Sequence, residues 1–287
     1  MRERTPFPSS LLAQLPNLKL LTTNGSRNYA LPFSSSRLPV LIANGVPGGH
    51  PYGAATSEHC WALILSACKG VVDGNNRIQL HRAGRIDGTG VVWQGSTNVG
   101  LCDKTLGILG LGRLGQRLVP VARAFGLKIL TWSPNLTQQR VDMIGQNIVL
   151  APDLKTFMST ADIITLQMVH SPQTHHILGA KELSWMKPSG ILVNTSRGGL
   201  IDTKALVQTL KDRKIRHAAI DVFEEEPFVA KNPFEGLTNV TLTPHMGYSE
   251  DEIIETWYEE TVDNVLSWLE DGGSRARAAG RELTADT

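Results

Sequence analysis

The sequence predicts an α/β fold built on a parallel sheet, and two patterns in its 287 residues predict it. In the middle of the chain, short apolar runs alternate with amphipathic stretches of helical period, as is typical of βαβ units. Within this region Gly110, Gly112 and Gly115 form a GxGxxG pattern that follows one apolar run and begins a helix. Together these patterns indicate a doubly wound sheet that binds its ligands at the carboxyl ends of the strands.

Seven of the apolar runs have the length and the aliphatic composition of buried strands. The two clearest amphipathic stretches between them cover residues 114–125 and 203–213, and Asp202 and Thr203 are residue types that cap a helix N-terminus. The predicted strands are residues 105–109, 128–132, 147–150, 162–167, 190–194, 217–221 and 239–243.

The two ends of the chain carry fewer elements. We expect strands at 18–22 and 40–43, a helix over 56–69 and a long helix over 251–270. Two strands cannot form a well-covered independent sheet, so both chain ends are expected to build one second lobe. The expected organisation is an incomplete N-terminal part of a substrate-binding lobe (1–96), a dinucleotide-binding domain (97–246), a helix that returns to the lobe (247–272) and a disordered tail (273–287).

Composition argues against nucleic acid and membranes as partners. Lys and Arg total 28 against 27 Asp and Glu, so the formal net charge is only +1, and both kinds of partner require a basic patch. No apolar run comes close to the roughly 20 residues of a membrane helix. The cysteines Cys60, Cys68 and Cys102 lack disulfide or metal-ligand spacing, so we expect a cytoplasmic protein without a metal site.

The glycine pattern predicts dinucleotide binding. In this context Gly110 permits a tight turn, Gly112 lets a pyrophosphate approach the backbone, and Gly115 allows close packing of the helix on the strand. The helix begins near Arg113 and Leu114, and its N-terminal N–H groups suit an anion.

The end of the second strand bears on the choice of cofactor. An acidic residue there would hold the ribose 2′-hydroxyl of NAD, but the expected position is Ser133. An acid would repel a 2′-phosphate, whereas Ser133, Asn135 and Thr137 could donate hydrogen bonds to one and Arg140 could reach it. The sequence therefore favours NADP over NAD, with both kept open.

Three further strands end in side chains that suit reduction of a 2-oxo acid. Arg197 comes close after one strand, Glu226 follows the next after a short turn, and His245 comes close after the last. Arginine binds a carboxylate in a bidentate manner, and histidine holds or releases a proton near neutral pH. A carboxylate nearby favours the protonated imidazole, which would then donate its proton to the substrate oxygen.

The sequence blocks around these residues resemble a known family. GLGRLG, NTSRGGLID, DVFEEEP and TPHMGYS, in this order and spacing, look like the D-isomer-specific 2-hydroxyacid dehydrogenases, which include glyoxylate, hydroxypyruvate and phosphoglycerate reductases or dehydrogenases. The resemblance implies hydride transfer between NAD(P)H and a small 2-oxo acid, and a homodimer. It also implies a Rossmann-type domain inserted into a smaller, flavodoxin-like α/β substrate lobe.

The resemblance assigns roles to individual residues. It implies a catalytic trio of Arg197, Glu226 and His245, and a substrate-binding role for Gly25, Ser26 and His50. The cofactor residues that we expect are Gly110, Gly112, Arg113, Leu114, Gly115, Ser133, Val169, Thr195, Ser196, Asp221 and Gly247.

Two departures from the family, at the start of the chain and in the tail after Gly272, leave other functions open. Members of the family usually begin with a further half-domain, so we expect the substrate lobe to be incomplete here. The alternatives are a dinucleotide-sensing, corepressor-like binding protein and a catalytically impaired paralogue. We interpret the adjacent His175 and His176, and the acidic residues Glu224 and Glu225, as solvated loop positions.

Overall fold

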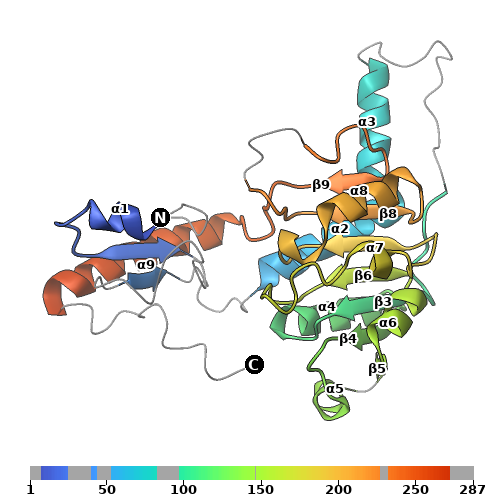
Figure 1. Cartoon of the computed structure of the whole chain (residues 1–287), viewed down its shortest axis with the longest axis horizontal. Coiled ribbons are helices and arrows are strands. Elements are labelled where there is room, and N and C mark those ends of the chain that lie inside the picture. The colour runs from blue at the N-terminus through green and yellow to red at the C-terminus, as the bar shows by residue number, and fades with distance from the viewer. Residues whose placement is uncertain are drawn as a thin grey trace. The chain divides into compact units, whose positions relative to one another are not determined.

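The computed structural model describes residues 8–24, 40–43, 53–82, 97–145, 147–226 and 232–271. The chain divides into two compact units (Figure 1). The larger unit is Gly53–Tyr248, and the smaller one joins Met1–Tyr52 to Ser249–Thr287. None of the helices in the described ranges is both long and apolar enough to cross a membrane.

The larger unit contains a seven-stranded, wholly parallel sheet in the order β5-β4-β3-β6-β7-β8-β9. The first strand lies inside the sheet; the chain adds two strands on one side of it and then four on the other, which confirms the predicted doubly wound fold. The carboxyl ends of all seven strands therefore lie along one edge. The strands are β3 Thr105–Leu109, β4 Lys128–Trp132, β5 Ile148–Leu150, β6 Ile163–Leu166, β7 Ile191–Asn194, β8 His217–Ile220 and β9 Val240–Leu242.

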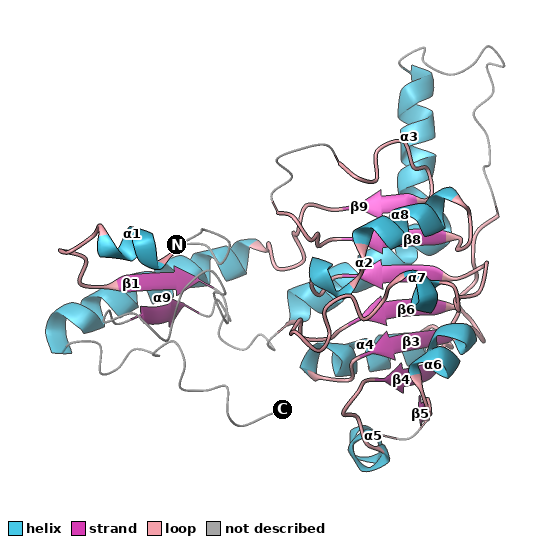
Figure 2. Cartoon of the chain, viewed as in Figure 1, coloured by secondary structure: helices cyan, strands magenta, loops and turns pink. Residues whose placement is uncertain are grey.

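Helices cover both faces of this sheet (Figure 2). Alternate residues of a strand point to opposite faces, so Ile191 and Val193 of β7 join one apolar cluster while Leu192 joins the other. The first cluster is completed by α2 (Ala54–Lys69) and α4 (Arg113–Ala124). The second is completed by α6 (Leu154–Thr160), α7 (Ala180–Leu183) and α8 (Thr203–Lys211). The other helices of this unit are α3 Val71–Arg82, α5 Gln138–Ile144 and the short 3₁₀ helix η1 Gly198–Leu200.

The position of α2 differs from the expected division of the chain. The expected substrate lobe included residues 1–96, but the structure groups Gly53–Tyr248 with the large sheet. Cys60 and Ile64 of α2 are fully buried in the same cluster as Leu106 and Ile108 of β3, which is the physical reason for the difference. The dinucleotide unit thus begins with α2.

The smaller unit contains two parallel strands, β1 (Leu21–Asn24) and β2 (Val40–Ala43), in the register Leu21↔Val40. The second has its predicted bounds, whereas the first lies about two to three residues later than the predicted 18–22. The unit also contains α1 (Ser9–Ala13) and α9 (Asp251–Asp271), and α9 packs against both strands. The tail 273–287 lies outside the described residues.

Candidate active site

The glycine loop between β3 and α4 leaves room for a ligand above the backbone. Gly110 has φ +101°, and a Cβ there would lie 2.7 Å from the carbonyl oxygen of Gln167. A Cβ on Gly115 would collide with the carbonyl oxygen of Gly110. A Cβ on Gly112, by contrast, would meet nothing within 4 Å. Gly110 and Gly115 are therefore required by packing, whereas Gly112 borders open space.

This open space lies at the N-terminus of α4. Gly112 is the N-cap residue and has no side chain to bond the first-turn N–H groups of the helix, which begins with Arg113 and Leu114. Such N–H groups carry a partial positive charge and bind anions such as a pyrophosphate. The exposed backbone of Gly112 and the helix end thus fit the phosphates of a dinucleotide.

The end of β4 carries no acidic side chain. Ser133, which follows Trp132, is half-buried, and its carbonyl oxygen accepts a hydrogen bond from the N–H of Leu136. The Thr137 hydroxyl accepts one from the N–H of Arg140, at 3.4 Å, and so caps α5. Thr137 therefore has a structural role that its sequence position did not indicate.

A buried polar network lies beneath the strand ends. The side-chain amide of Gln167, directly after β6, donates to the hydroxyls of Thr165 (3.0 Å) and Thr195 (3.3 Å) and to the thiol of Cys60 (3.5 Å). Burial raises the pKa of the Cys60 thiol to about 11, so this sulfur stays neutral and inert. Thr195, expected near the cofactor, is itself buried and held by Gln167.

The turn after β7 presents Arg197. The Asn194 side chain accepts a hydrogen bond from the N–H of Ser196 and donates one to the carbonyl of Arg197, each at 3.0 Å. Ser196 Oγ also donates to the carbonyl of Met168, at 2.5 Å. The half-buried Arg197 has an extended backbone, and its guanidinium donates to the carbonyl of Ser196 at 2.7 Å. The turn is thus fixed on both sides of the arginine.

The two glycines after Arg197 are needed for close contact with neighbouring loops. A Cβ on Gly198 would collide with the backbone of Phe223, in the turn that leads to Glu226. A Cβ on Gly199 would lie 2.7 Å from the ring of His170. The Arg197 turn therefore packs directly against the turn that carries the predicted glutamate.

The structure pairs Glu226 with His245. The imidazole Nδ1 lies 2.6 Å from Oε2 of Glu226, and the other carboxylate oxygen accepts the N–H of Phe223 at 2.7 Å. The two side chains are only 14% and 12% exposed. The ring of Tyr248 lies edge-on to the imidazole, with 5.9 Å between centroids.

Asp221 holds the loop that contains His245. Its carboxylate accepts the backbone N–H groups of Met246 (3.0 Å) and Gly247 (3.1 Å), and the Thr243 hydroxyl at 2.5 Å. Burial alone would raise the pKa of Asp221, but hydrogen bonds from His59, Thr243 and Met246 outweigh it and keep the pKa low. We predicted cofactor contacts for Asp221 and Gly247; the structure gives the pair a further role in shaping this loop.

His59 is a residue that the sequence analysis left without a role. From α2 its Nε2 lies 3.2 Å from Asp221 and 3.1 Å from the Thr243 hydroxyl. Since 162 residues separate His59 from Asp221, no local pattern could indicate this contact.

Some loop residues interpreted as solvated are paired. Glu224 accepts hydrogen bonds from His176 (2.5 Å) and from the N–H of Thr203 at the start of α8 (3.1 Å), and His175 lies 3.1 Å from His170. The side chains of His176 and Glu224 are still 36% and 32% exposed, so they are in contact with solvent as expected but are also paired with each other. Across the described ranges, no group of three or more His, Cys, Asp or Glu side chains has a metal-binding arrangement.

Other predicted residues lie apart from this cluster or outside the described ranges. Val169 is 71% exposed on the loop after β6. Gly25, Ser26 and His50 lie outside the described residues.

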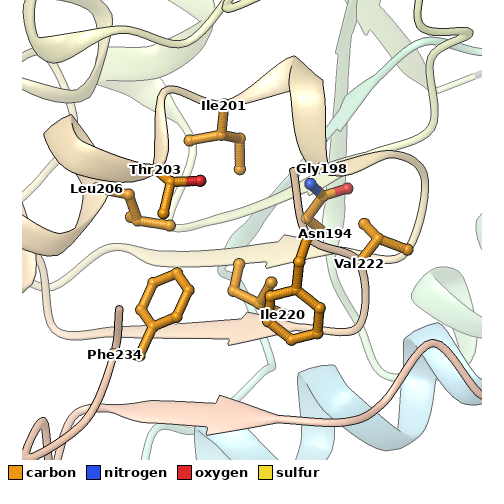
Figure 3. A pocket seen from close by; sticks show the side chains of 9 residues that line it. Asn194, Gly198, Ile201, Thr203, Leu206, Ile220, Val222 and Phe234 are labelled. Atoms are coloured by element: carbon orange, nitrogen blue, oxygen red, sulfur yellow. The ribbon is translucent and has the colours of Figure 1, made fainter. Parts of the chain in front are cut away.

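A small hollow lies on the α8 side of the same strand ends (Figure 3). Its lining contains no charged side chain and none of the predicted catalytic trio, so it is a gap in apolar packing. The lining residues are Asn194, Gly198, Ile201, Thr203, Leu206, Ile220, Val222, Phe223 and Phe234.

Comparison with known proteins places this geometry in context. The family model "D-isomer specific 2-hydroxyacid dehydrogenase, NAD binding domain" matches residues 61–247. The chain is 34% identical over 263 residues to the glyoxylate reductase of Thermococcus litoralis. The aligned region covers 90% of this chain and 76% of that protein.

Two solved structures extend the likeness to the fold. The phosphoglycerate oxidoreductase of Vibrio cholerae O395 is 33% identical, with a TM-score of 0.78 over 93% of this chain and 82% of that one. The D-lactate dehydrogenase of Aquifex aeolicus, complexed with NAD and lactic acid, is 25% identical, with a TM-score of 0.76. The superposition covers 94% of this chain and 82% of that one.

Proposed function

This chain belongs to the D-isomer specific 2-hydroxyacid dehydrogenase family, and from that membership we propose that it interconverts a small 2-oxo acid and the D-2-hydroxy acid with a nicotinamide cofactor. The observation that carries the proposal is the 2.6 Å pair of Glu226 and His245 at the carboxyl edge of a dinucleotide-type sheet. An imidazole held by a carboxylate is suited to proton transfer, and the adjoining turn supplies the guanidinium of Arg197.

The glycine loop would hold the cofactor. The backbone around Gly112 and the first turn of α4, from Arg113 to Gly115, would bind the pyrophosphate. Ser133 would lie at the adenosine ribose, and the strand ends at Val169, Thr195, Ser196 and Gly247 would line the rest. When bound, the reduced nicotinamide supplies the hydride for C2 of the substrate.

Arg197 would bind the substrate carboxylate through two parallel N–H···O bonds and polarise the 2-oxo group. Its turn is fixed by Asn194 and Ser196, so the guanidinium starts from a defined backbone. The loops at Gly25, Ser26 and His50 remain predicted further contacts to the substrate.

His245 would exchange the proton of the substrate oxygen. Because Nδ1 is held by Glu226, Nε2 is the nitrogen that faces the reaction. Glu226 holds the ring in this orientation, so the proton donor is in place before the carbonyl oxygen gains charge.

We favour NADP over NAD, because no carboxylate follows β4. A Ser133→Asp variant restores the acid that repels a 2′-phosphate. It should lower the kcat/KM ratio of NADPH to NADH at least tenfold; a wild-type enzyme that strongly prefers NADH would contradict this choice.

The resemblance also supports a homodimer, which light scattering would test.

Cys60, Cys68 and Cys102 are all unpaired, which supports action in the reducing cytoplasm.

Turnover tests the proposal as a whole. Glyoxylate, hydroxypyruvate, pyruvate and phenylpyruvate would each be supplied with NADPH and with NADH, and cofactor oxidation followed at 340 nm. Reduction of at least one acid is expected. Tight cofactor binding without turnover of any acid would favour a dinucleotide-sensing protein instead.

A further inference from the structure

The contact of His59 with Asp221 joins α2 to the loop that carries His245. Nε2 of His59 lies within hydrogen-bond distance of both the Asp221 carboxylate and the Thr243 hydroxyl, and the imidazole is 16% exposed. These three residues come from a helix, the end of β8 and the end of β9. The same loop then turns and presents His245.

The direction of each hydrogen bond follows from counting protons. The Thr243 hydroxyl has one proton, and its 2.5 Å contact with the Asp221 carboxylate uses it. Thr243 can therefore only accept from His59, and the carboxylate is also an acceptor. Nε2 of His59 must carry a proton and donate to both.

The loop needs such anchoring because His245 has an unfavourable backbone conformation. Its φ is +53°, in the left-handed region that residues with a Cβ rarely adopt. Conformations of this kind persist only when the surroundings over-determine them. Here Asp221 binds the side chain of Thr243 on one side of His245 and the N–H groups of Met246 and Gly247 on the other.

We propose that His59 is a positioning residue that fixes the Asp221 carboxylate and, through it, the backbone that aims His245 at the substrate. The proposal rests on the proposed role of His245 in proton transfer. His59 also lies against Gly247, where a Cβ would come within 3.3 Å of its ring, so the imidazole limits the loop sterically as well.

The test separates the Nε2–H donor from the bulk of the ring. His59→Phe keeps a ring but removes the donor, and His59→Gln places an amide N–H at a similar reach. The matched control is His217→Phe, because His217 also bonds a threonine hydroxyl, that of Thr241 at 2.9 Å, but at the opposite end of β8.

Two readouts are used on the full-length protein. The first is hydrogen–deuterium exchange of the segment 243–248 without added ligands, and the second is steady-state kinetics. His59→Phe should speed exchange of this segment about tenfold, which corresponds to loss of one hydrogen bond to a charged group. The same variant should lower kcat at least about tenfold. It should leave KM for the oxo acid within about threefold of wild type, because the turn of Arg197 is fixed by Asn194 and Ser196.

His59→Gln should restore the exchange rate and kcat to within about threefold of wild type. His217→Phe should change neither the exchange rate nor kcat. The proposal is overturned if His59→Phe behaves like wild type, if His59→Gln is as impaired as His59→Phe, or if His217→Phe speeds exchange equally. Exchange needs no turnover, so it tests the anchoring even if the proposed reaction is wrong. Absence of turnover in the wild-type protein would contradict the proposed function alone.

Discussion

Nδ1 of His245 and Oε2 of Glu226 lie 2.6 Å apart, and both side chains are largely shielded from solvent. They come from the ends of two neighbouring parallel strands, β9 and β8. The carboxylate holds Nδ1 of the imidazole and so fixes the orientation of the ring. Loss of either partner should therefore affect catalysis in a distinct and measurable way.

Replacing His245 with asparagine should remove the proton donor and keep the loop. Asparagine tolerates a left-handed φ better than alanine does, so the +53° backbone is retained. We expect kcat for 2-oxo acid reduction to fall about 10²- to 10⁴-fold, as for other general acids. The dissociation constant of NADPH, from quenching of protein fluorescence, should stay within about threefold. Substantial turnover by this variant would refute the role of His245.

Glu226→Gln should remove the charge and keep the bond to the Phe223 N–H. The neutral amide holds Nδ1 of His245 less firmly than the carboxylate does, so kcat for 2-oxo acid reduction should fall at least about tenfold. Steady-state kinetics compared with wild type measure this fall, and NADPH affinity serves as the control. An unchanged kcat would mean that Glu226 does not position His245.

Arg197→Lys keeps the positive charge but loses the planar pair of donors. We expect kcat/KM for the oxo acid to fall about 10²-fold, and more for Arg197→Gln. Cofactor affinity serves as the control and should be unaffected in both variants. A lysine variant as active as wild type would show that bidentate binding is not used.

Gly112→Ala and Gly115→Ala should affect different properties: the first should weaken cofactor binding, and the second should lower stability. A methyl group on Gly112 meets no protein atom and costs less than about 1 kcal/mol of unfolding free energy, but it fills the space predicted for the pyrophosphate. Cofactor affinity should fall at least tenfold. Gly115→Ala should lower the free energy of unfolding by about 1–3 kcal/mol, because its Cβ meets the Gly110 carbonyl. Urea unfolding and cofactor titration of both variants measure the contrast, and equal cofactor affinity in wild type and Gly112→Ala would contradict the predicted site.

His217 should make the protein less stable in acid. Burial, reinforced by Arg216, lowers the pKa of His217 from 6.5 to about 4. The unfolded chain thus binds a proton that the folded chain does not, and stability falls as the pH drops from about 6.5 toward 4. His217→Gln should reduce the loss of unfolding free energy between pH 7 and pH 4.5 by about 2 kcal/mol. Urea titrations at both pH values measure it; the same loss in both proteins would contradict the assignment.

The sequence predicted the large sheet well, because every strand is a short apolar run between turns. The strands β3 and β4 have their predicted bounds, and the others in this sheet differ by about one residue at one or both ends. The parallel order then brings separate strand ends to one edge, which is why a glutamate and a histidine 19 residues apart could be predicted to meet.

Other features depend on contacts between distant segments. The apolar face of α2 has the same pattern whichever sheet it covers, so the sequence did not show that it packs on the large one. His59 was missed for the same reason, and so were the partners of Glu224, because His176 is 48 residues away and Thr203 is the first residue of α8.

The burial of two sulfurs has a practical consequence for labelling. Cys60 and Cys68 are inaccessible and their thiol pKa values are raised to about 11, whereas Cys102 is exposed. A maleimide dye should therefore attach to Cys102 alone in the native protein. Since Cys102 precedes the amino end of β3, the dye would lie at the sheet edge opposite the glycine loop and leave the reacting groups undisturbed.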